Sequence, residues 1–233
     1  MLSLVDARAR RGAFTLAADL DVEAGARVAV MGASGSGKST LLDMIAGFVP
    51  LERGRVRWGG ADLTGLPPGD RPISVLFQDS NLFPHLTAER NVGLGIRPDL
   101  RLGDGERARV AEALASVGLE GLGDRRPSAL SGGQRSRVAL ARLLVQARPL
   151  ALVDEPFAAL GPALREEMLD LMAALLDRTG ATLLMVTHAP GDARRLCPQT
   201  VIVEEGRAHE PVPTGPLLDD PPEGLRRYLG EAG

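Results

Sequence analysis

The chain has 233 residues, a net charge of -3 at pH 7 and an apolar content of 44%. Its length and apolar content suffice for one large domain with a buried core. The slightly negative charge and an aromatic content of 3% argue against a nucleic-acid-binding surface, which needs basic patches and stacking rings. Cys197 is the single cysteine, so an internal disulfide is excluded and a small buried side chain is expected. No uncharged apolar run approaches the roughly 20 residues that span a bilayer, so we expect a soluble or peripheral protein.

Short apolar runs along the chain predict buried strands. They lie at Val28–Met31, Ile73–Phe77, Leu150–Val153, Thr182–Val186 and Val201–Val203. After the first run, Leu41–Ala46 predicts a helix that ends before Gly47 and Pro50. Because such runs alternate with helical stretches, the sequence predicts an α/β fold with a mainly parallel sheet covered by helices.

Other segments depart from this alternation. Residues 2–30 and 54–62 have the short strands and turns of a small antiparallel sheet beside the core. Residues 85–145 contain no convincing strand, while Gly105–Val117 and Gly132–Val145 predict helices. We therefore expect a helical subdomain at about 85–145, inserted in the core.

The end of the chain differs in composition from the rest. From Pro211 onward it is rich in proline and glycine, so little structure is expected. We treat residues 207–233 as a C-terminal tail and residues 1–233 as a single domain.

The loop after the first predicted strand has the pattern G-x-x-x-x-G-K-[ST]. It consists of Gly32, Ala33, Ser34, Gly35, Ser36, Gly37, Lys38, Ser39 and Thr40. Glycines let successive backbone N–H groups point at phosphate oxygens, and the dipole of the following helix favours the anion. The pattern assigns Lys38 to the β- and γ-phosphates of a nucleotide and Ser39 to Mg²⁺. A flexible linker is the alternative, but the position between strand and helix favours a phosphate-binding P-loop.

Polar residues also follow other predicted strands, at the edge where α/β sheets place ligands. Asp154 and Glu155 follow Leu150–Val153, where Asp154 would hold Mg²⁺ and Glu155 would polarise an attacking water. Two helix-capping acids are the alternative, which the neighbouring P-loop disfavours. Gln78 and His188 end two further strands; such residues are more often structural when they stand alone, but this edge favours a functional role.

A second glycine-rich element precedes a predicted helix. It reads Leu130-Ser131-Gly132-Gly133-Gln134. A helix N-terminus of this kind binds anions, although Ser131 as a simple N-cap is the alternative. Either the chain binds two phosphates, or this site serves another copy of the chain.

These elements, in this order, resemble the nucleotide-binding subunit of ABC transporters over nearly the whole chain, to about Gly206. The resemblance implies a P-loop NTPase core of the RecA-like type with a small antiparallel β subdomain and an inserted helical subdomain. It also implies that two copies close head to tail around two ATP molecules with Mg²⁺. The signature residues of one copy would then face the ATP held by the P-loop of the other. These residues are Ser131, Gly132, Gly133 and Gln134.

The resemblance further implies roles for single residues in ATP hydrolysis coupled to transport. Glu155 would be the catalytic base, and His188 would steady the γ-phosphate and the attacking water. Lys38 would hold phosphate, and Gln78 would touch Mg²⁺ and relay its state to the membrane subunits. The implied metal ligands are Ser39, Gln78 and Asp154.

Within that family, Leu76–Thr87 and Asn91–Gly95 look like the corresponding segments of thiamine importer ATPases. This closer resemblance implies integral membrane permease subunits as partners, and indirectly a periplasmic thiamine-binding protein. It places the chain at the cytoplasmic face of the inner membrane as a peripheral subunit without nucleic-acid partners. Related importers of iron, molybdate or polyamines share much of the pattern, and a soluble ABC-type ATPase or a non-catalytic ATP binder are further alternatives.

Two positions depart from the family pattern. Gly161 stands where an aspartate that helps to couple the two ATP sites is usual, which puts that coupling in question. An aromatic residue ahead of the P-loop usually stacks on adenine. Phe14 is the only aromatic available in that region, and its register leaves adenine stacking unassigned.

Lys38 yields a first testable prediction, because it is the only lysine beside 26 arginines among the 27 basic residues. Guanidinium is broad and planar, whereas a narrow phosphate cradle needs the compact ammonium. We predict that Lys38→Arg abolishes most ATP hydrolysis although the charge is preserved, as measured by phosphate release from the assembled transporter. An active Lys38→Arg transporter would show that this lysine has no special role.

Overall fold

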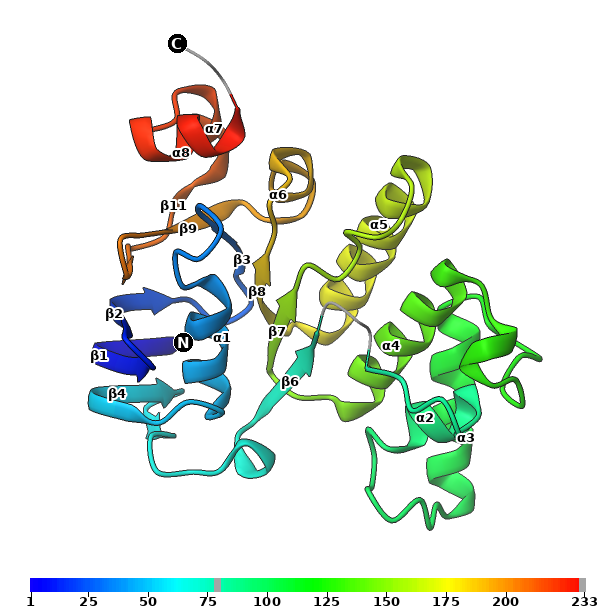
Figure 1. The fold of residues 1–233 in the computed structure, drawn as a ribbon. Coiled ribbons are helices and arrows are strands. Elements are labelled where there is room, and N and C mark those ends of the chain that lie inside the picture. The colour runs from blue at the N-terminus through cyan, green and yellow to red at the C-terminus, as the bar shows by residue number, and fades with distance from the viewer. Residues whose placement is uncertain (78–80, 231–233) are drawn as a thin grey trace.

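A computed structural model describes residues 1–77 and 81–230 and shows a sheet with helices on both sides (Figure 1). The strands are β1 (Leu2–Arg11), β2 (Phe14–Val22), β3 (Arg27–Met31), β4 (Leu51–Trp58), β5 (Ala61–Asp62), β6 (Ile73–Leu76), β7 (Leu150–Asp154), β8 (Thr182–Val186), β9 (Gln199–Glu204), β10 (Arg207–Ala208) and β11 (Val212–Pro213). The helices are α1 (Lys38–Ala46), α2 (Ala88–Gly93), α3 (Asp104–Ser116), α4 (Gly132–Gln146), α5 (Pro162–Thr179), α6 (Pro190–Leu196), α7 (Thr214–Asp219) and α8 (Glu223–Leu229). The strand order is β5-β4-β1-β2-β10-β9-β3-β8-β7-β6, and β11 pairs with β9.

The central part of the sheet is parallel. Strands β9, β3, β8, β7 and β6 pair side by side in the same direction. Their side chains alternate between two cores: Val28 and Val30 of β3 pack on the side of α1, and Ala29 and Met31 pack on the side of α4, α5 and α6. Both faces are thus buried, which explains why these strands read as continuous apolar runs. The predicted α/β class and the five predicted strands are confirmed, with ends that shift by one or two residues.

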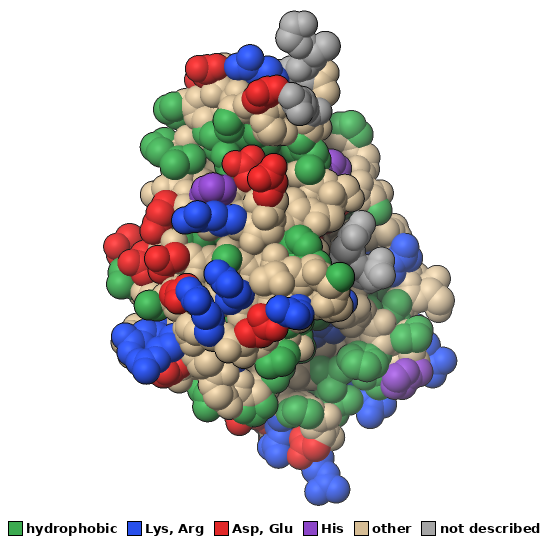
Figure 2. Space-filling model, turned by 60° about the vertical axis from the view of Figure 1, so that its left-hand side comes forward, with side chains coloured by type: hydrophobic (Ala, Val, Ile, Leu, Met, Phe, Trp, Pro, Cys, Tyr) green, Lys and Arg blue, Asp and Glu red, His purple; other side chains and the backbone are tan. Residues whose placement is uncertain are grey.

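The antiparallel sheet predicted near the N-terminus is also present. β1 pairs antiparallel with both β2 and β4, and its register shifts at a bulge between Leu4 and Ala7. On the face drawn in Figure 2, arginine side chains (blue) are interspersed with carboxylates (red). Among the exposed ion pairs of this region, Arg10 lies 2.8 Å from Glu52. Such exposed pairs contribute little to stability.

Only helices and turns lie in the described residues between β6 and β7. The observed α3 and α4 differ by one residue at most from the predicted helices. Asn91 of α2 is fully buried, and its amide donates to the carbonyl oxygens of Phe83, Leu86 and Thr87 and accepts from the Phe83 N–H. One side chain therefore fixes the turn that leads into the helices. The division into a subdomain of about 85–145 stays a prediction.

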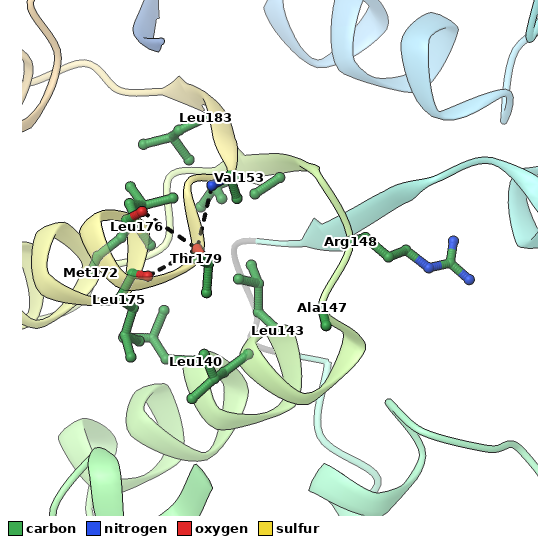
Figure 3. Close-up of a pocket in the computed structure, with 13 residues that line it drawn as sticks. Leu140, Leu143, Ala147, Arg148, Val153, Met172, Leu175, Leu176, Thr179 and Leu183 are labelled. Carbon is green, nitrogen blue, oxygen red and sulfur yellow. Dashed lines mark hydrogen bonds between the residues drawn. The ribbon is translucent and has the colours of Figure 1, made fainter. Parts of the chain in front are cut away.

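An apolar pocket lies where α4 and α5 meet the sheet (Figure 3). Leu140 and Leu143 of α4 face Leu175 of α5 across it. The Thr179 hydroxyl donates to the Leu175 carbonyl at 2.9 Å, so it is already satisfied. The guanidinium of Arg148 extends away and donates to the carbonyl of Ile73 at 3.0 Å. Both polar side chains of the lining are therefore already hydrogen-bonded to backbone carbonyls.

The C-terminal residues are more ordered than the sequence predicted, so the expectation of little structure after Pro211 is wrong. Helices α7 and α8 form, and Leu218 and Leu225 are buried. Thr214 is buried at the start of α7, where its hydroxyl donates to the Cys197 carbonyl at 2.6 Å. Widely spaced apolar residues anchor this segment, and its high proline and glycine content makes them easy to overlook in the sequence.

Cys197 is buried as predicted, and this burial raises the pKa of its thiol to about 12.

None of the helices in the described ranges has the length and hydropathy of a bilayer-spanning segment.

The C-terminal end of α1 is held by a buried arginine, Arg71. Its guanidinium donates to the carbonyls of Met44 and Ile45 in the last turn of α1, and to those of Thr64 and Leu66. A cation at this end of a helix also complements the helix dipole. Because α1 begins at the P-loop, Arg71 fixes the opposite end of the same helix.

We predict that Arg71→Leu lowers the free energy of unfolding by about 2–3 kcal/mol, because buried carbonyls lose their donor. Urea unfolding followed by circular dichroism measures this change. Arg55→Leu is the matched control, since Arg55 is exposed and lies 3.9 Å from Asp62, so its loss should change stability by less than about 0.5 kcal/mol. Equal effects of the two changes would contradict the anchoring role of Arg71.

Candidate nucleotide-binding site

The loop between β3 and α1 has a backbone that only glycine fits at its first position. Gly32 has a φ of 151°, and a Cβ there would overlap the carbonyl oxygen of Val203 in β9. Gly37 caps α1 with a φ of 112°, and a Cβ on it would lie 2.9 Å from the Phe14 ring. Because Gly37 has no side chain that could cap the helix, the backbone N–H groups at the start of α1 can bind an anion.

Lys38 begins α1 and turns back over the loop. Its Nζ donates to the carbonyls of Gly32 and Ala33, both at 2.8 Å. Burial lowers the pKa of Lys38, while the charges of Glu155 and Asp154 oppose that shift. A partly desolvated ammonium gains much from an anion placed against it.

The fit of a phosphate group can be tested on the loop itself. The Ser36 Oγ is buried and has no hydrogen-bond partner among the described residues. An unsatisfied buried hydroxyl is costly, and a phosphate oxygen would supply the missing acceptor. Together with the glycine cradle and Lys38, this hydroxyl makes the loop fit the phosphates of a nucleotide.

Two residues assigned to Mg²⁺ meet at the same edge of the sheet. The Ser39 hydroxyl of α1 donates to Asp154 Oδ2 of β7 at 2.9 Å. Burial raises the pKa of Asp154, partly offset by this hydrogen bond, and the nearby charge of Glu155 raises it further. No group of three His, Cys, Asp or Glu side chains that could hold a metal occurs in residues 1–77 and 81–230. Mg²⁺ takes one or two protein oxygens and completes its shell with phosphate and water.

Glu155 and His188 contact each other directly. His188 Nδ1 lies 3.0 Å from Glu155 Oε2. Glu155 has a left-handed backbone with a φ of 43°, and its N–H donates to the carbonyl of Val186 at 3.0 Å. The end of β8 thereby sets where the carboxylate points.

A network missed by sequence reasoning fixes the turn that carries His188. Arg165 of α5 donates from Nε and Nη2 to Asp192 of α6, at 2.9 and 2.6 Å. The Thr187 hydroxyl donates to the same carboxylate at 3.4 Å and accepts from the N–H of Ala189 at 3.1 Å. The pairing joins residues 27 positions apart, so no local pattern could have revealed it.

A hollow opens over the P-loop and Glu155. It is lined by Phe14, Ser34, Gly35, Gly37, Lys38, Ser39, Thr40, Glu155 and Val186. Phe14 at the start of β2 thus contributes aromatic surface beside the P-loop, at the position whose register the sequence left open. The structure brings together the P-loop, Asp154, Glu155 and His188 from three separate segments.

The signature residues lie apart from this hollow. Ser131 is the N-cap of α4: its hydroxyl accepts from the Gln134 N–H at 3.2 Å, and Gln134 Oε1 accepts from the Ser131 N–H at 2.9 Å. Nothing would obstruct a side chain at Gly132, whereas a Cβ at Gly133 would lie 2.6 Å from Leu164. None of the four lines the hollow above Lys38. Gln78, the remaining predicted site residue, lies outside the described residues.

Known proteins resemble the chain along most of its length. Residues 16–158, more than half of the chain, match the family described as ABC transporter. The thiamine import ATP-binding protein ThiQ of Cereibacter sphaeroides is 59% identical over 99% of this chain and 100% of its own length. The proteins of the same name from Ruegeria and Jannaschia are 56% and 53% identical, over 99% and 98% of this chain and 100% of theirs.

A solved structure shares the fold. It is a dimeric ATP-binding cassette in a post-hydrolysis state with bound ADP and Pi, and it is 30% identical, with a TM-score of 0.78 over 92% of this chain and 99% of its own. The predicted P-loop NTPase fold and the predicted family are both confirmed. By family match and by full-length relatives, the chain belongs to the ABC transporter family as an ATP-binding subunit.

Proposed function

We propose that this chain is the ATP-hydrolysing subunit of an importer for thiamine and its phosphates. One observation carries the hydrolytic part: the P-loop and Glu155 line one hollow, where Ser39 is hydrogen-bonded to Asp154 and Glu155 contacts His188. The full-length identity of 59% to a thiamine import ATP-binding protein supports the substrate.

The geometry supports a simple division of roles. Lys38 and the loop N–H groups bind the β- and γ-phosphates of ATP, and Ser39 and Asp154 would hold Mg²⁺, which would neutralise phosphate charge. Glu155 accepts the proton of the water that attacks the γ-phosphate as the bond to ADP breaks. His188 orients the Glu155 carboxylate through their 3.0 Å contact.

The separation of the signature residues from the P-loop supports a dimer. Within one chain, Ser131, Gly132, Gly133 and Gln134 do not reach the hollow above Lys38. A head-to-tail pair of copies brings the signature residues of one copy over the P-loop of the other. The structural neighbour is itself dimeric and holds the products of hydrolysis.

The remaining partners follow from the transport role. The subunit works at the cytoplasmic face of the inner membrane on integral membrane permease subunits, which receive thiamine from a periplasmic binding protein. Gln78 would relay the state of the Mg²⁺ site to the permease.

Related importers of iron, molybdate or polyamine are the alternative to thiamine. To separate them, ATP hydrolysis by the reconstituted transporter is measured with each substrate-loaded binding protein, and stimulation by thiamine alone is expected.

We predict that Glu155→Gln lowers ATP turnover by about 100-fold or more, because the amide cannot accept the proton of water. ATP binding should persist, so a binding assay and a phosphate-release assay on the assembled transporter separate the two steps. Glu166→Gln on the exposed face of α5 is the control and should keep normal turnover. Turnover at the normal rate in Glu155→Gln would remove Glu155 from the mechanism.

Gly161 gives a second prediction for the dimer. It is the N-cap of α5 with an ordinary φ of −64°, and a side chain there meets nothing within 4 Å. Gly161→Asp should therefore fold normally, gain a few tenths of a kcal/mol from capping α5, and raise the Hill coefficient of ATP hydrolysis. Gly161→Asn supplies the cap without the charge and should leave the Hill coefficient unchanged. An unchanged Hill coefficient in Gly161→Asp would show that the two sites couple without this aspartate.

A further inference from the structure

The C-terminal helix α8 packs against the P-loop, far from it in sequence. A second hollow lies between them, lined by the loop residues Gly32 to Ser36, by Ile202 to Glu205, and by Gly224, Leu225 and Tyr228 of α8. In Figure 1 the loop between β3 and α1 projects toward the same end of the molecule as α7 and α8. The helix therefore forms one wall of this hollow, and the P-loop forms another.

Two contacts hold α8 in this place. Leu225 is only 2% exposed and belongs to the core that α5 and α6 share. Gly224 faces β9, since a Cβ there would lie 2.8 Å from the carboxylate oxygen of the Glu204 side chain. The anchoring leaves one aromatic side chain of α8 directed at the phosphate site.

That side chain is Tyr228. The Lys38 Nζ lies over its ring, 5.7 Å from the centroid. A cation at this distance from an aromatic face is attracted by the negative π-cloud. Desolvation raises the pKa of the Tyr228 hydroxyl, and the charge of Glu155 raises it further. Tyr228 therefore lies beside the lysine that is assigned to the β- and γ-phosphates.

We propose that Tyr228 is a positioning residue for Lys38, which holds the ammonium in the nucleotide-free subunit and competes with the terminal phosphate of ATP for it. This inference rests on the proposed function. The Tyr228 ring and the phosphate are both attracted to the Lys38 ammonium. The negative face of the ring offers no favourable contact to a phosphate oxygen, so both cannot occupy the same side of Lys38. Nucleotide binding accordingly displaces the ring from Lys38.

The competition lowers the apparent affinity for ATP. Only the fraction of molecules in which Tyr228 has left Lys38 binds the terminal phosphate, so the observed Kd equals the intrinsic Kd divided by that fraction. A half-exposed cation–π contact corresponds to about a 2- to 5-fold effect on Kd. Because the ring is already displaced in the ATP-bound enzyme, the rate at saturating ATP is unaffected.

The test compares Tyr228→Leu with Tyr228→Phe in the full chain. Tyr228→Leu removes the aromatic face and should tighten ATP binding about 2- to 5-fold by titration calorimetry, with a matching fall in KM and an unchanged kcat in the assembled transporter. Tyr228→Phe keeps the face and should behave as the unmodified chain does. Equal or weaker ATP binding by Tyr228→Leu overturns the proposal, since weaker binding would make Tyr228 a direct contact of the nucleotide.

A second measurement follows the helix itself. Hydrogen exchange of residues 225–229 in the unmodified subunit should become faster when a non-hydrolysable ATP analogue is added, and ADP, which lacks the terminal phosphate, should cause less change. Unchanged or slower exchange with the analogue overturns the proposal even if a variant folds poorly. Failure of the unmodified chain to bind ATP at all would instead overturn the proposed function, so the two failures are distinguishable.

Discussion

The site depends on the parallel register of three neighbouring strands. Val30 of β3 pairs with Val186 of β8, and Val186 pairs in turn with Asp154 of β7. The three strands therefore end at one level, and the residues that follow them lie side by side. Hydrogen bonds across the strand ends reinforce this alignment, as the Glu155 N–H donates to the carbonyl of Val186. The geometry of the candidate site is a consequence of sheet register more than of any single loop.

The two apolar cores maintain that register from opposite faces. One core joins β3 to α1 and the antiparallel strands, and the other joins the same strand to α4, α5 and α6. Because alternate residues of β3 enter different cores, slippage by one residue would exchange Val28 and Val30 for Ala29 and Met31 on each face. Because such slippage would cost free energy in both cores, the register of β3 is fixed. The positions of Gly32 and Lys38 beyond the end of β3 are fixed with it.

Local patterns predicted the elements that are buried on both faces and the loop that follows them. Continuous apolar runs identified all five parallel strands, and the glycine spacing identified the phosphate loop, since both depend only on neighbours in sequence. The position of Phe14 beside Gly37 depends on how β2 crosses the loop, which no local pattern encodes. The Arg165–Asp192 pair likewise joins two helices across a strand end.

The C-terminal segment was predicted wrongly for a similar reason. Its proline and glycine content indicated a loose tail, but Leu218 and Leu225 are buried by residues that lie far away in sequence. Composition indicates only the structure that a segment would adopt in isolation. The order of α7 and α8 comes from the surface that the rest of the chain presents to them.

Glu155 occupies a backbone conformation that glycine or asparagine would adopt more easily. A side chain of this kind in the left-handed region costs on the order of 1–3 kcal/mol, which the surrounding sheet must offset. Replacement by glycine would relieve that strain and remove the carboxylate in the same step. With Glu155 as the proposed catalytic base, selection for thermostability and selection for catalysis oppose each other at this residue. A search for variants based on stability alone would then favour inactive ones.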